Sequence, residues 1–488
     1  MRKLVSEIRL FSGFMMRRTL IAVGLIFLFT GPALAQLKPD TTENDPFKND
    51  PFFSAPLKDL LRHPNTDPDS VSESEEHDTK HFVSQLNEEG LDFRGVIEAG
   101  PYNSNPLYSV YPNLPMIHYN RVDALFLGIS KERMQWYQDD WLLGIPEIHL
   151  QGLIGYSTGQ KEWQYTLGME KYIGRKHHVM IGAEYHNATT TNDNWRVGLN
   201  ETTLTAFFGG YDYLDYYKQK GWGFYLLTRS NRYFEGGLAF SDDRFNSLSK
   251  TTDWALFGSG DRYRPNPPVH SPSFGALTAL PSDTANITSL TFSASFNPKR
   301  LVLSKGFTFS LTGTAEFADP GIGTDSDFNY QKYTGELISY IHLEPGGVFK
   351  YRLRMSTITG ESPRFKQLYL GGIGSLRALP YKSMGAGNQM ILSNAELQFG
   401  SPRFGSNGWI DFNDFYISLF LDSGWTDYDP RLEDSSNPFG GLDRFKLSDL
   451  KHNGGIGIGS SLIRFEMAWD LNNTSRAPVF WVRFNPTF

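Results

Sequence analysis

The sequence predicts an all-β protein, a transmembrane antiparallel β-barrel of about sixteen strands, on three observations. Apolar and polar residues alternate with period two over long stretches such as 289–297, which is typical of strands with one lipid-facing and one lumen-facing side. The 488 residues are 15% aromatic and include 47 glycines, a composition that favours strands and turns. The mean hydropathy of −0.38 fits a barrel because alternation keeps the average low.

Charge and cysteine content exclude several classes of protein. The chain has 46 basic and 53 acidic side chains, a net charge of −7, so it lacks the basic surface of a nucleic-acid-binding protein. It has no cysteine, which excludes disulfides, thiolate metal sites, a cysteine nucleophile and a lipidated N-terminal cysteine.

The first element along the chain is a predicted signal peptide, residues 1–35. Arg17 and Arg18 precede an apolar run at 20–29, and Ala33-Leu34-Ala35 supplies a small-residue cleavage site. The apolar run is about half the roughly 20 residues that a membrane-spanning helix needs. We therefore expect cleavage after Ala35 and export of the mature protein. Together with the barrel pattern, this predicts a location in the outer membrane of a bacterial cell.

Residues 36–110 are predicted to be a disordered, acidic periplasmic tail. They contain Asp-Pro-Phe twice, at 45–47 and 50–52, and an acidic stretch at 72–76. Such a segment cannot bury enough apolar surface to offset the entropy lost on ordering. The barrel is then expected to occupy residues 111–488.

Sixteen segments carry the strand pattern, and their connections largely alternate between short and long, as in barrels with two different rims. The segment 197–209 is included because a single-chain bacterial barrel should have an even number of strands, although residues 214–218 nearby fit the start of a short helix equally well. A soluble β-sandwich or propeller is disfavoured by strands of ten or more residues and by aromatic residues near strand ends. The final segment ends on Phe488, as barrel proteins do at their C-terminus. The predicted strands are 117–129, 146–156, 161–172, 177–188, 197–209, 221–230, 233–242, 286–297, 305–317, 331–342, 347–358, 389–399, 413–422, 452–460, 462–470 and 479–488.

Three motifs follow the strand at 347–358. A glycine-rich stretch, Leu-Gly-Gly-Ile-Gly-Ser-Leu-Arg-Ala-Leu-Pro-Tyr, occupies 370–381; Asn-Ala-Glu-Leu-Gln-Phe occupies 394–399; and Phe-Leu-Asp-Ser-Gly occupies 420–424. Their order resembles the outer-membrane assembly and translocation superfamily, which includes BamA, TamA and the bacterial surface antigens. The resemblance covers about 360–488, and residues 119–123 add a weaker match.

The resemblance implies that a long extracellular loop folds back into the barrel lumen, with an arginine at its tip. In the family the tip reads apolar-Arg-Gly-aromatic; Leu376 and Arg377 fit the first two positions, while Ala378 and Leu379 depart from the last two. The residues that match the loop motif are Gly371, Gly372, Gly374, Leu376, Arg377 and Tyr381, and those that match the later motifs are Glu396, Phe420, Asp422 and Gly424.

Strand alternation independently assigns three carboxylates to the lumen. Glu396, Asp422 and Glu466 each stand opposite the apolar face of their own strand, so successive strands aim them into one sector. A guanidinium such as that of Arg377 would find two-pronged carboxylate partners there. The alternative is that these are unrelated charges in a wet channel, each of little energetic value; we favour the specific cluster.

No enzymatic motif is present. The sequence has no G-x-S-x-G, H-E-x-x-H or phosphate-loop pattern. His177 and His178 are adjacent in a predicted strand and point to opposite faces. Ser460, Ser461 and His452 are the remaining candidates for a hydrolase, and nothing in the sequence singles them out. We therefore expect no catalytic, cofactor-binding or metal-binding residues.

The resemblance implies a barrel that moves or inserts a macromolecule at the outer membrane, with lipid around it and protein partners or cargo reaching it through the tail or the lumen. Family members with this activity carry periplasmic POTRA domains, and residues 36–90 are too short and too polar for one. A passive diffusion channel, or a structural subunit of an outer-membrane complex, is the alternative.

Overall fold

The computed structural model describes residues 107, 110–112, 114–131, 148–173, 179–231, 233–257, 263–269, 284–298, 307–322, 326–343, 347–400, 415–460 and 463–484. The predicted signal peptide, nearly all of the predicted tail, and His177, His178, Ser461 and Phe488 lie outside these residues, so what was expected of them stays a prediction.

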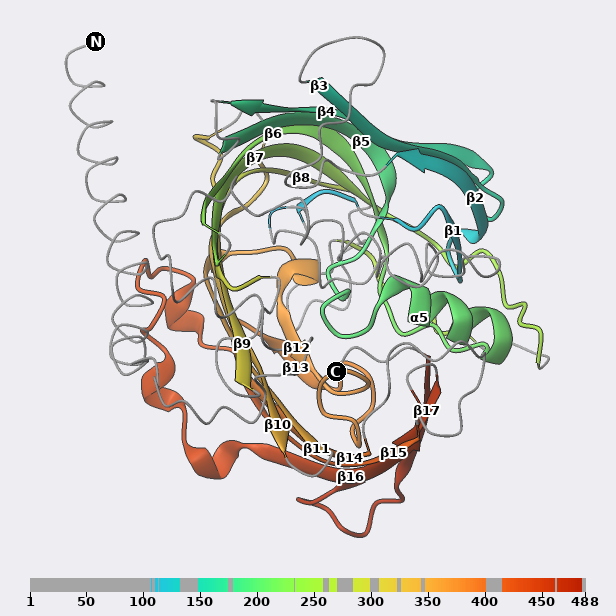
Figure 1. Cartoon of the computed structure of the whole chain (residues 1–488). Coiled ribbons are helices and arrows are strands. Elements are labelled where there is room, and N and C mark those ends of the chain that lie inside the picture. The colour runs from blue at the N-terminus through green and yellow to red at the C-terminus, as the bar shows by residue number, and fades with distance from the viewer. Residues whose placement is uncertain are drawn as a thin grey trace, which may run out of the picture. The chain divides into compact units, whose positions relative to one another are not determined.

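Sixteen antiparallel strands form one sheet that curves into a barrel (Figure 1). Strands that follow each other in the chain are neighbours in the sheet, except that β11 pairs with β14, because β12 and β13 form a separate two-stranded sheet. The predicted all-β antiparallel barrel of about sixteen strands is therefore confirmed. The strands of the barrel are β1 Ile117–Asn120, β2 Ala124–Lys131, β3 Ile148–Ser157, β4 Glu162–Ile173, β5 Val179–Thr190, β6 Tyr217–Asn231, β7 Phe234–Ser247, β8 Thr284–Phe296, β9 Phe307–Ala318, β10 Asn329–Leu343, β11 Gly347–Glu361, β14 Gln389–Phe399, β15 Tyr416–Asp427, β16 Lys451–Gly459, β17 Ile463–Asp470 and β18 Val479–Phe484.

The two faces of the strands have opposite polarity. In β15, Ile417, Leu419 and Leu421 are 46–48% exposed, whereas Phe420 and Asp422, which alternate with them, are buried. Apolar side chains that point outward and polar ones that point inward reverse the pattern of a water-soluble protein and match a lipid-facing barrel. None of the helices in the described part of the chain is long and apolar enough to cross a membrane.

The predicted strand 117–129 is wrong in one respect, because it is divided into β1 and β2. The Asn120 side-chain oxygen accepts hydrogen bonds from the backbone nitrogens of Val122 (2.9 Å) and Asp123 (2.6 Å), which turns the chain. Ala124 follows with a φ of 52°, in the left-handed region. The two strands therefore form a tight hairpin.

The predicted strand 197–209 is also wrong, because this segment is helical. It contains the α-helix α5 Leu199–Leu204, continued by the π-helical turn η3 Thr205–Gly209, and it ends at Gly210, whose φ of 73° is the left-handed conformation common at helix ends. The sheet still has sixteen strands. The predicted strand 197–209 is absent, but the predicted strand 117–129 is two strands instead of one.

A loop of residues 362–388 connects β11 to β14. It contains η4 Arg364–Lys366 and the hairpin of β12 Leu368–Leu370 and β13 Met384–Gly387. Consecutive antiparallel strands place this loop at the same end of the barrel as 191–216, 248–257, 263–269 and 428–450; this end is termed the loop rim. The 428–450 connection carries η6 Pro430–Leu432, η7 Leu442–Arg444 and η8 Leu447–Asp449.

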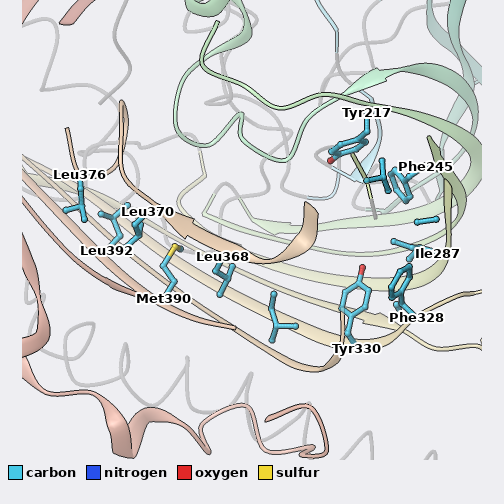
Figure 2. Packing of buried hydrophobic residues seen from close by; sticks show 14 of the residues in the cluster. Tyr217, Phe245, Ile287, Phe328, Tyr330, Leu368, Leu370, Leu376, Met390 and Leu392 are labelled. Carbon is cyan, nitrogen blue, oxygen red and sulfur yellow. The ribbon is translucent and has the colours of Figure 1, made fainter. Parts of the chain in front are cut away.

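The apolar core lies inside the barrel, between this loop and the wall (Figure 2). Leu368, Leu370 and Leu376 of the loop pack in one buried cluster with Met390 and Leu392, which point inward from β14. At the other end of the cluster lie residues of β6, β7, β8 and β10, namely Tyr217, Phe245, Ile287 and Tyr330. Burial of these side chains fixes the loop in the lumen.

Candidate functional site

The tip of the 362–388 loop is enclosed by protein. Residues 371–379 are all buried. The tip is a compact turn, in which the Gly372 nitrogen donates to the Leu376 carbonyl (3.0 Å) and the Gly371 nitrogen donates to the Ser375 hydroxyl (3.1 Å). The prediction of a long loop folded into the lumen is therefore confirmed.

The three predicted glycines of the tip are required by backbone conformation. Gly371, Gly372 and Gly374 have φ values of 107°, 88° and 70°, which side chains rarely permit. Gly374 also lies against the neighbouring 191–216 connection, where a Cβ would stand 1.9 Å from the Arg196 carbonyl oxygen. Glycine thus allows both the turn and the close packing of two loops.

Arg377 lies at the centre of the site and contacts carboxylates from three strands. Its Nε and Nη2 are each 2.8 Å from an oxygen of Asp422, and its Nη1 is 3.1 Å from Glu466 and 3.5 Å from Glu396. The guanidinium stacks on Phe420, 3.4 Å from the ring centroid. The structure thus brings together the predicted residues Arg377, Asp422, Glu396 and Glu466, which are termed the Arg377 cluster.

Adjacent strands hold these carboxylates in register. Asn394 of β14 pairs directly with Asp422 of β15, and its side-chain nitrogen donates to Asp422 (2.7 Å) and to the Ser375 carbonyl (3.0 Å). Gly424 of β15 leaves space for the loop leucines, because a Cβ there would lie 2.8 Å from Leu370 and 3.3 Å from Leu376. The later motifs therefore form the wall that receives the loop tip.

Burial by itself would lower the pKa of Arg377, because removal from water disfavours the charged form. The carboxylates of Asp422, Glu466 and Glu396 outweigh burial and raise the pKa of Arg377 above its ordinary value. The arginine is therefore charged at neutral pH.

Several residues of the site were not identified from the sequence. Arg464 of β17 lies 2.7 Å from Glu396 and also contacts Glu466, and Trp481 of β18 donates its indole N–H to the Arg377 carbonyl (2.8 Å). Arg483 of β18 pairs with Glu201 of α5 through two bonds of 2.9 and 3.0 Å. Alternation does place Arg464 on the lumen face of β17, but not its partners, and it could have placed Arg483 on the lumen face of β18. Glu201 was missed because its segment was predicted to be a strand.

A second group of charges holds the loop nearer the loop rim. The Tyr381 hydroxyl donates to Asp193 (2.9 Å), and Lys382 lies 2.7 Å from Asp193 and 2.8 Å from Asp215. Burial alone would raise the pKa of Asp215, but Lys382 and Arg264 outweigh it and lower that pKa to about 2. Tyr381, predicted as part of the motif, thus fixes the loop to the 191–216 connection.

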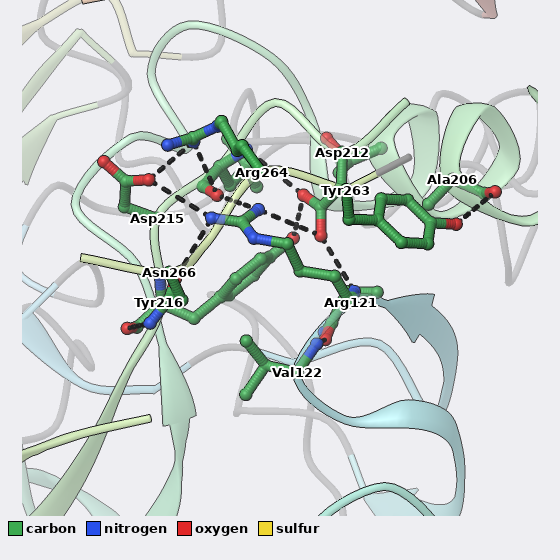
Figure 3. A network of polar contacts seen from close by, with 12 residues as sticks. Arg121, Val122, Ala206, Asp212, Asp215, Tyr216, Tyr263, Arg264 and Asn266 are labelled. Atoms are coloured by element: carbon green, nitrogen blue, oxygen red, sulfur yellow. Dashed lines mark hydrogen bonds and ion pairs between the residues drawn. The ribbon is translucent and has the colours of Figure 1, made fainter. Parts of the chain in front are cut away.

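Asp215 also belongs to a network of polar contacts around Arg121 of the β1–β2 turn (Figure 3). The Arg121 backbone nitrogen donates to Asp212 (2.9 Å), and its guanidinium donates to the Leu214 carbonyl (2.6 Å) and to Asn266 (3.1 Å). This network connects the first hairpin of the barrel to two connections of the loop rim. Residues 119–123, the weaker sequence match, therefore include the arginine at the centre of this network.

Two of the three hydrolase candidates, His452 and Ser460, lie within the described residues and are far apart. His452 and Ser460 lie at opposite ends of β16, roughly 26 Å apart at about 3.3 Å per strand residue. The His452 Nδ1 is instead 2.8 Å from the Ser423 hydroxyl. Within the described residues, no group of three or more His, Asp or Glu side chains is arranged to hold a metal ion.

A cavity of about 340 Å³ remains in the lumen beside the loop. Hydroxyl-bearing residues of β8 to β11 form much of its lining, including Thr291, Ser310, Thr312 and Thr334. Charged residues, among them Glu336 and Arg354, complete it. The lumen is therefore packed on one side and polar and hollow on the other.

Comparison with known proteins finds similarity among solved structures. No family model and no curated protein sequence matches the chain. The chain is similar to BamA from Haemophilus ducreyi lacking POTRA domains 1–3, at 16% identity and a TM-score of 0.46, over 75% of this chain and 68% of that one. It is also similar to CdiB from Acinetobacter baumannii (8%, TM-score 0.36, 69% of this chain and 53% of that one) and CdiB from Escherichia coli (14%, 0.39, 75% and 60%).

Proposed function

We propose that the protein is an integral barrel of the bacterial outer membrane that moves or inserts a macromolecule, and that it catalyses no bond chemistry. The observation that carries this proposal is the Arg377 cluster. A loop crosses into the lumen, and charged side chains on three separate strands hold its tip. Arg377, Glu396 and Asp422 of this cluster belong to the motifs on which the resemblance to assembly and translocation barrels rests.

The way in which the loop is held supports a role as a plug fixed in one position. Asp422 binds Arg377 through two parallel bonds. Asn394 donates to the Ser375 carbonyl, and Trp481 donates to the carbonyl of Arg377 itself. A two-pronged contact specifies orientation as well as attraction. Such a plug keeps the lumen closed to small solutes while partner or cargo proteins act on the barrel.

A passive diffusion channel is the second candidate, and the polar cavity favours it. The cavity is lined by hydroxyl and charged side chains, which suits water and small hydrophilic solutes. In this alternative the loop is only a constriction, and the Arg377 cluster shapes it.

Deletion of the gene in the native host, followed by complementation, separates the two functions. If the barrel assembles or translocates proteins, the deletion should lower the amounts of other outer-membrane or surface proteins, measured by quantitative mass spectrometry. Wild type should restore them and Arg377→Ala should not. Unchanged amounts of these outer-membrane and surface proteins, together with slower uptake of small hydrophilic solutes, would contradict the proposal and support the channel.

A further inference from the structure

The helical segment α5–η3 lies between the two ends of the sheet. It contacts both β1 and β18, the first and last strands, and Figure 1 shows α5 in the part of the ring between β1 and β17. β1 has 4 residues. A strand that crosses a membrane needs roughly 9–11 residues, so β1 by itself does not span the wall at this point.

The polarity of this helix is reversed relative to a helix on a water-soluble protein. Asn200, Glu201, Thr202 and Thr205 are buried, whereas Leu204, Phe207 and Phe208 are partly exposed. A helix that faces water shows the opposite arrangement. The strands of the barrel share the reversed arrangement, with polar groups inside and apolar groups outside.

The polar face of the helix is directed to the lumen. Glu201 pairs with Arg483, whose side chain is fully buried. On the other side of β18, Phe480 and Val482 are 71% and 41% exposed. Since Arg483 alternates with these residues, its partner Glu201 lies on the inner side of the wall.

The apolar face continues the outer surface of the first hairpin. Tyr119 shares a face of β1 with the exposed Ile117, and it pairs with the exposed Leu125 of β2. Tyr119 itself is buried. Phe207 covers the Tyr119 ring at 5.5 Å, and the Tyr119 hydroxyl donates to the Trp254 carbonyl (2.7 Å). The outer face of β1 thus runs without interruption into the helix.

Residues 254–257 extend the same surface. The nitrogens of Leu256 and Phe257 donate to the carbonyls of Phe207 (2.8 Å) and Phe208 (3.0 Å). Trp254, Leu256 and Phe257 are 51%, 47% and 68% exposed, and Tyr211 is 62% exposed. Neither 202–211 nor 254–257 contains a charged residue. The aromatic patch is defined as Phe207, Phe208, Tyr211, Trp254, Leu256 and Phe257.

We propose that α5, η3 and residues 254–257 complete the membrane-facing wall between β1 and β18, with the aromatic patch in contact with lipid. Lipid is the occupant because the patch is continuous with the outward apolar face of the hairpin. Its aromatic, uncharged composition is that of the girdles at membrane interfaces. Exposed apolar surfaces of this extent are rare on proteins that face only water. This inference depends on the barrel fold and not on the proposed function.

Site-directed spin labelling tests the proposal, because the chain has no cysteine of its own. Tyr211→Cys and Phe257→Cys, each carrying a nitroxide, are placed in phospholipid vesicles, and collision with oxygen is compared with collision with a water-soluble nickel chelate. Leu421→Cys, on the outward face of β15, is the lipid reference, and Asp434→Cys, exposed at the loop rim, is the water reference.

At positions 211 and 257, the ratio of the collision rate with oxygen to that with the nickel chelate is expected to be close to the ratio at position 421. Nickel accessibility like that at 434 would overturn the proposal, since the patch would then face water. A label shielded from both reagents would also overturn it, because protein would then cover the patch.

A second pair of variants tests the same surface without a label. Phe257→Asp should reduce the amount of folded, heat-modifiable protein recovered in vesicles severalfold, because a carboxylate would face lipid. Phe439→Asp removes a similarly exposed phenylalanine from the 428–450 connection and should leave recovery unchanged. Equal recovery of both variants would contradict the proposed lipid contact.

Discussion

Arg377 has three carboxylate partners and is 2% exposed, so its removal leaves buried charges without their cation. Loss of one partner of a buried ion pair typically costs about 3–5 kcal/mol, against about 0–1 kcal/mol for an exposed pair. Arg377→Ala should therefore lower the heat-modification temperature clearly and expose residues 362–388 to protease. Wild-type behaviour in both assays would mean that the cluster does not hold the loop.

Two further variants distinguish the two-pronged Arg377–Asp422 contact from the positive charge at position 377. Arg377→Lys should restore only part of the stability, because an ammonium group cannot make the two-pronged contact with Asp422. Asp422→Ala removes the same interaction from the other side, so Arg377→Ala combined with Asp422→Ala should cost less than the sum of the single variants. Additive losses would show that the two residues act independently.

Gly374 and Gly385 form a matched pair within one loop. Gly374 has a φ of 70° and no room for a Cβ, whereas a Cβ at Gly385 would meet nothing within 4 Å. Gly374→Ala should displace the loop from the 191–216 connection and increase proteolysis between 362 and 388. Gly385→Ala should be cleaved at the wild-type rate; equal rates for both variants would contradict the close packing at Arg196.

At the scale of elements, the contact between the 362–388 loop and the 191–216 connection should depend on pH. The pKa of Asp215 is lowered from 3.8 to about 2, so its ion pairs are fully present above about pH 4 and are lost as the pH falls through 2. Pepsin should thus cleave the wild-type loop faster as the pH is lowered from 4 to 2. Asp215→Asn should already be cleaved rapidly at pH 4.

The control for this experiment is Asp434→Asn, which changes an exposed carboxylate elsewhere at the loop rim. It should reproduce the wild-type pH profile. The difference between Asp215→Asn and wild type should shrink toward pH 2, where about half of the Asp215 carboxylates in the folded wild-type protein are protonated. A constant difference at all pH values would assign the effect to lost packing.

Strand alternation was sufficient to predict most of the barrel, because one face of each strand meets lipid and the other meets the lumen. The same alternation assigned Glu396, Asp422 and Glu466 to the lumen, and the structure places all three around Arg377. Their distances to the arginine could not be predicted, since they depend on how far the loop descends.

The errors arose where local chemistry overrides alternation. The Asn120 side chain bonds the backbone two and three residues on and divides the first predicted strand. In 197–209 strand parity was given more weight than the spacing of Leu204, Phe207 and Phe208, which is i, i+3, i+4 and therefore helical. Gly210 at the end of this segment was a second helical signal.

At the scale of the whole molecule, the folded-in loop should limit ion flow. The loop packs against β14, its Arg377 binds Asp422 of β15, and a cavity of about 340 Å³ lies beside it. Wild-type protein in planar bilayers should therefore show little steady conductance. Replacement of residues 372–381 by a short Gly-Ser linker should produce large, stable openings; equally large openings in wild type would support the passive channel.

The pairing of Glu201 with Arg483 also determines when the barrel can finish folding. The two residues are 282 positions apart, so their contact closes a ring of chain that contains every strand from β6 to β18. Contacts of such long range form late and slowly, because much chain entropy must be lost first. A chain that stops before β18 would keep an unpaired edge at β17, a site for adhesion to other chains. Completion of the wall is therefore expected to be the last step of folding, reached only when the end of the chain is present.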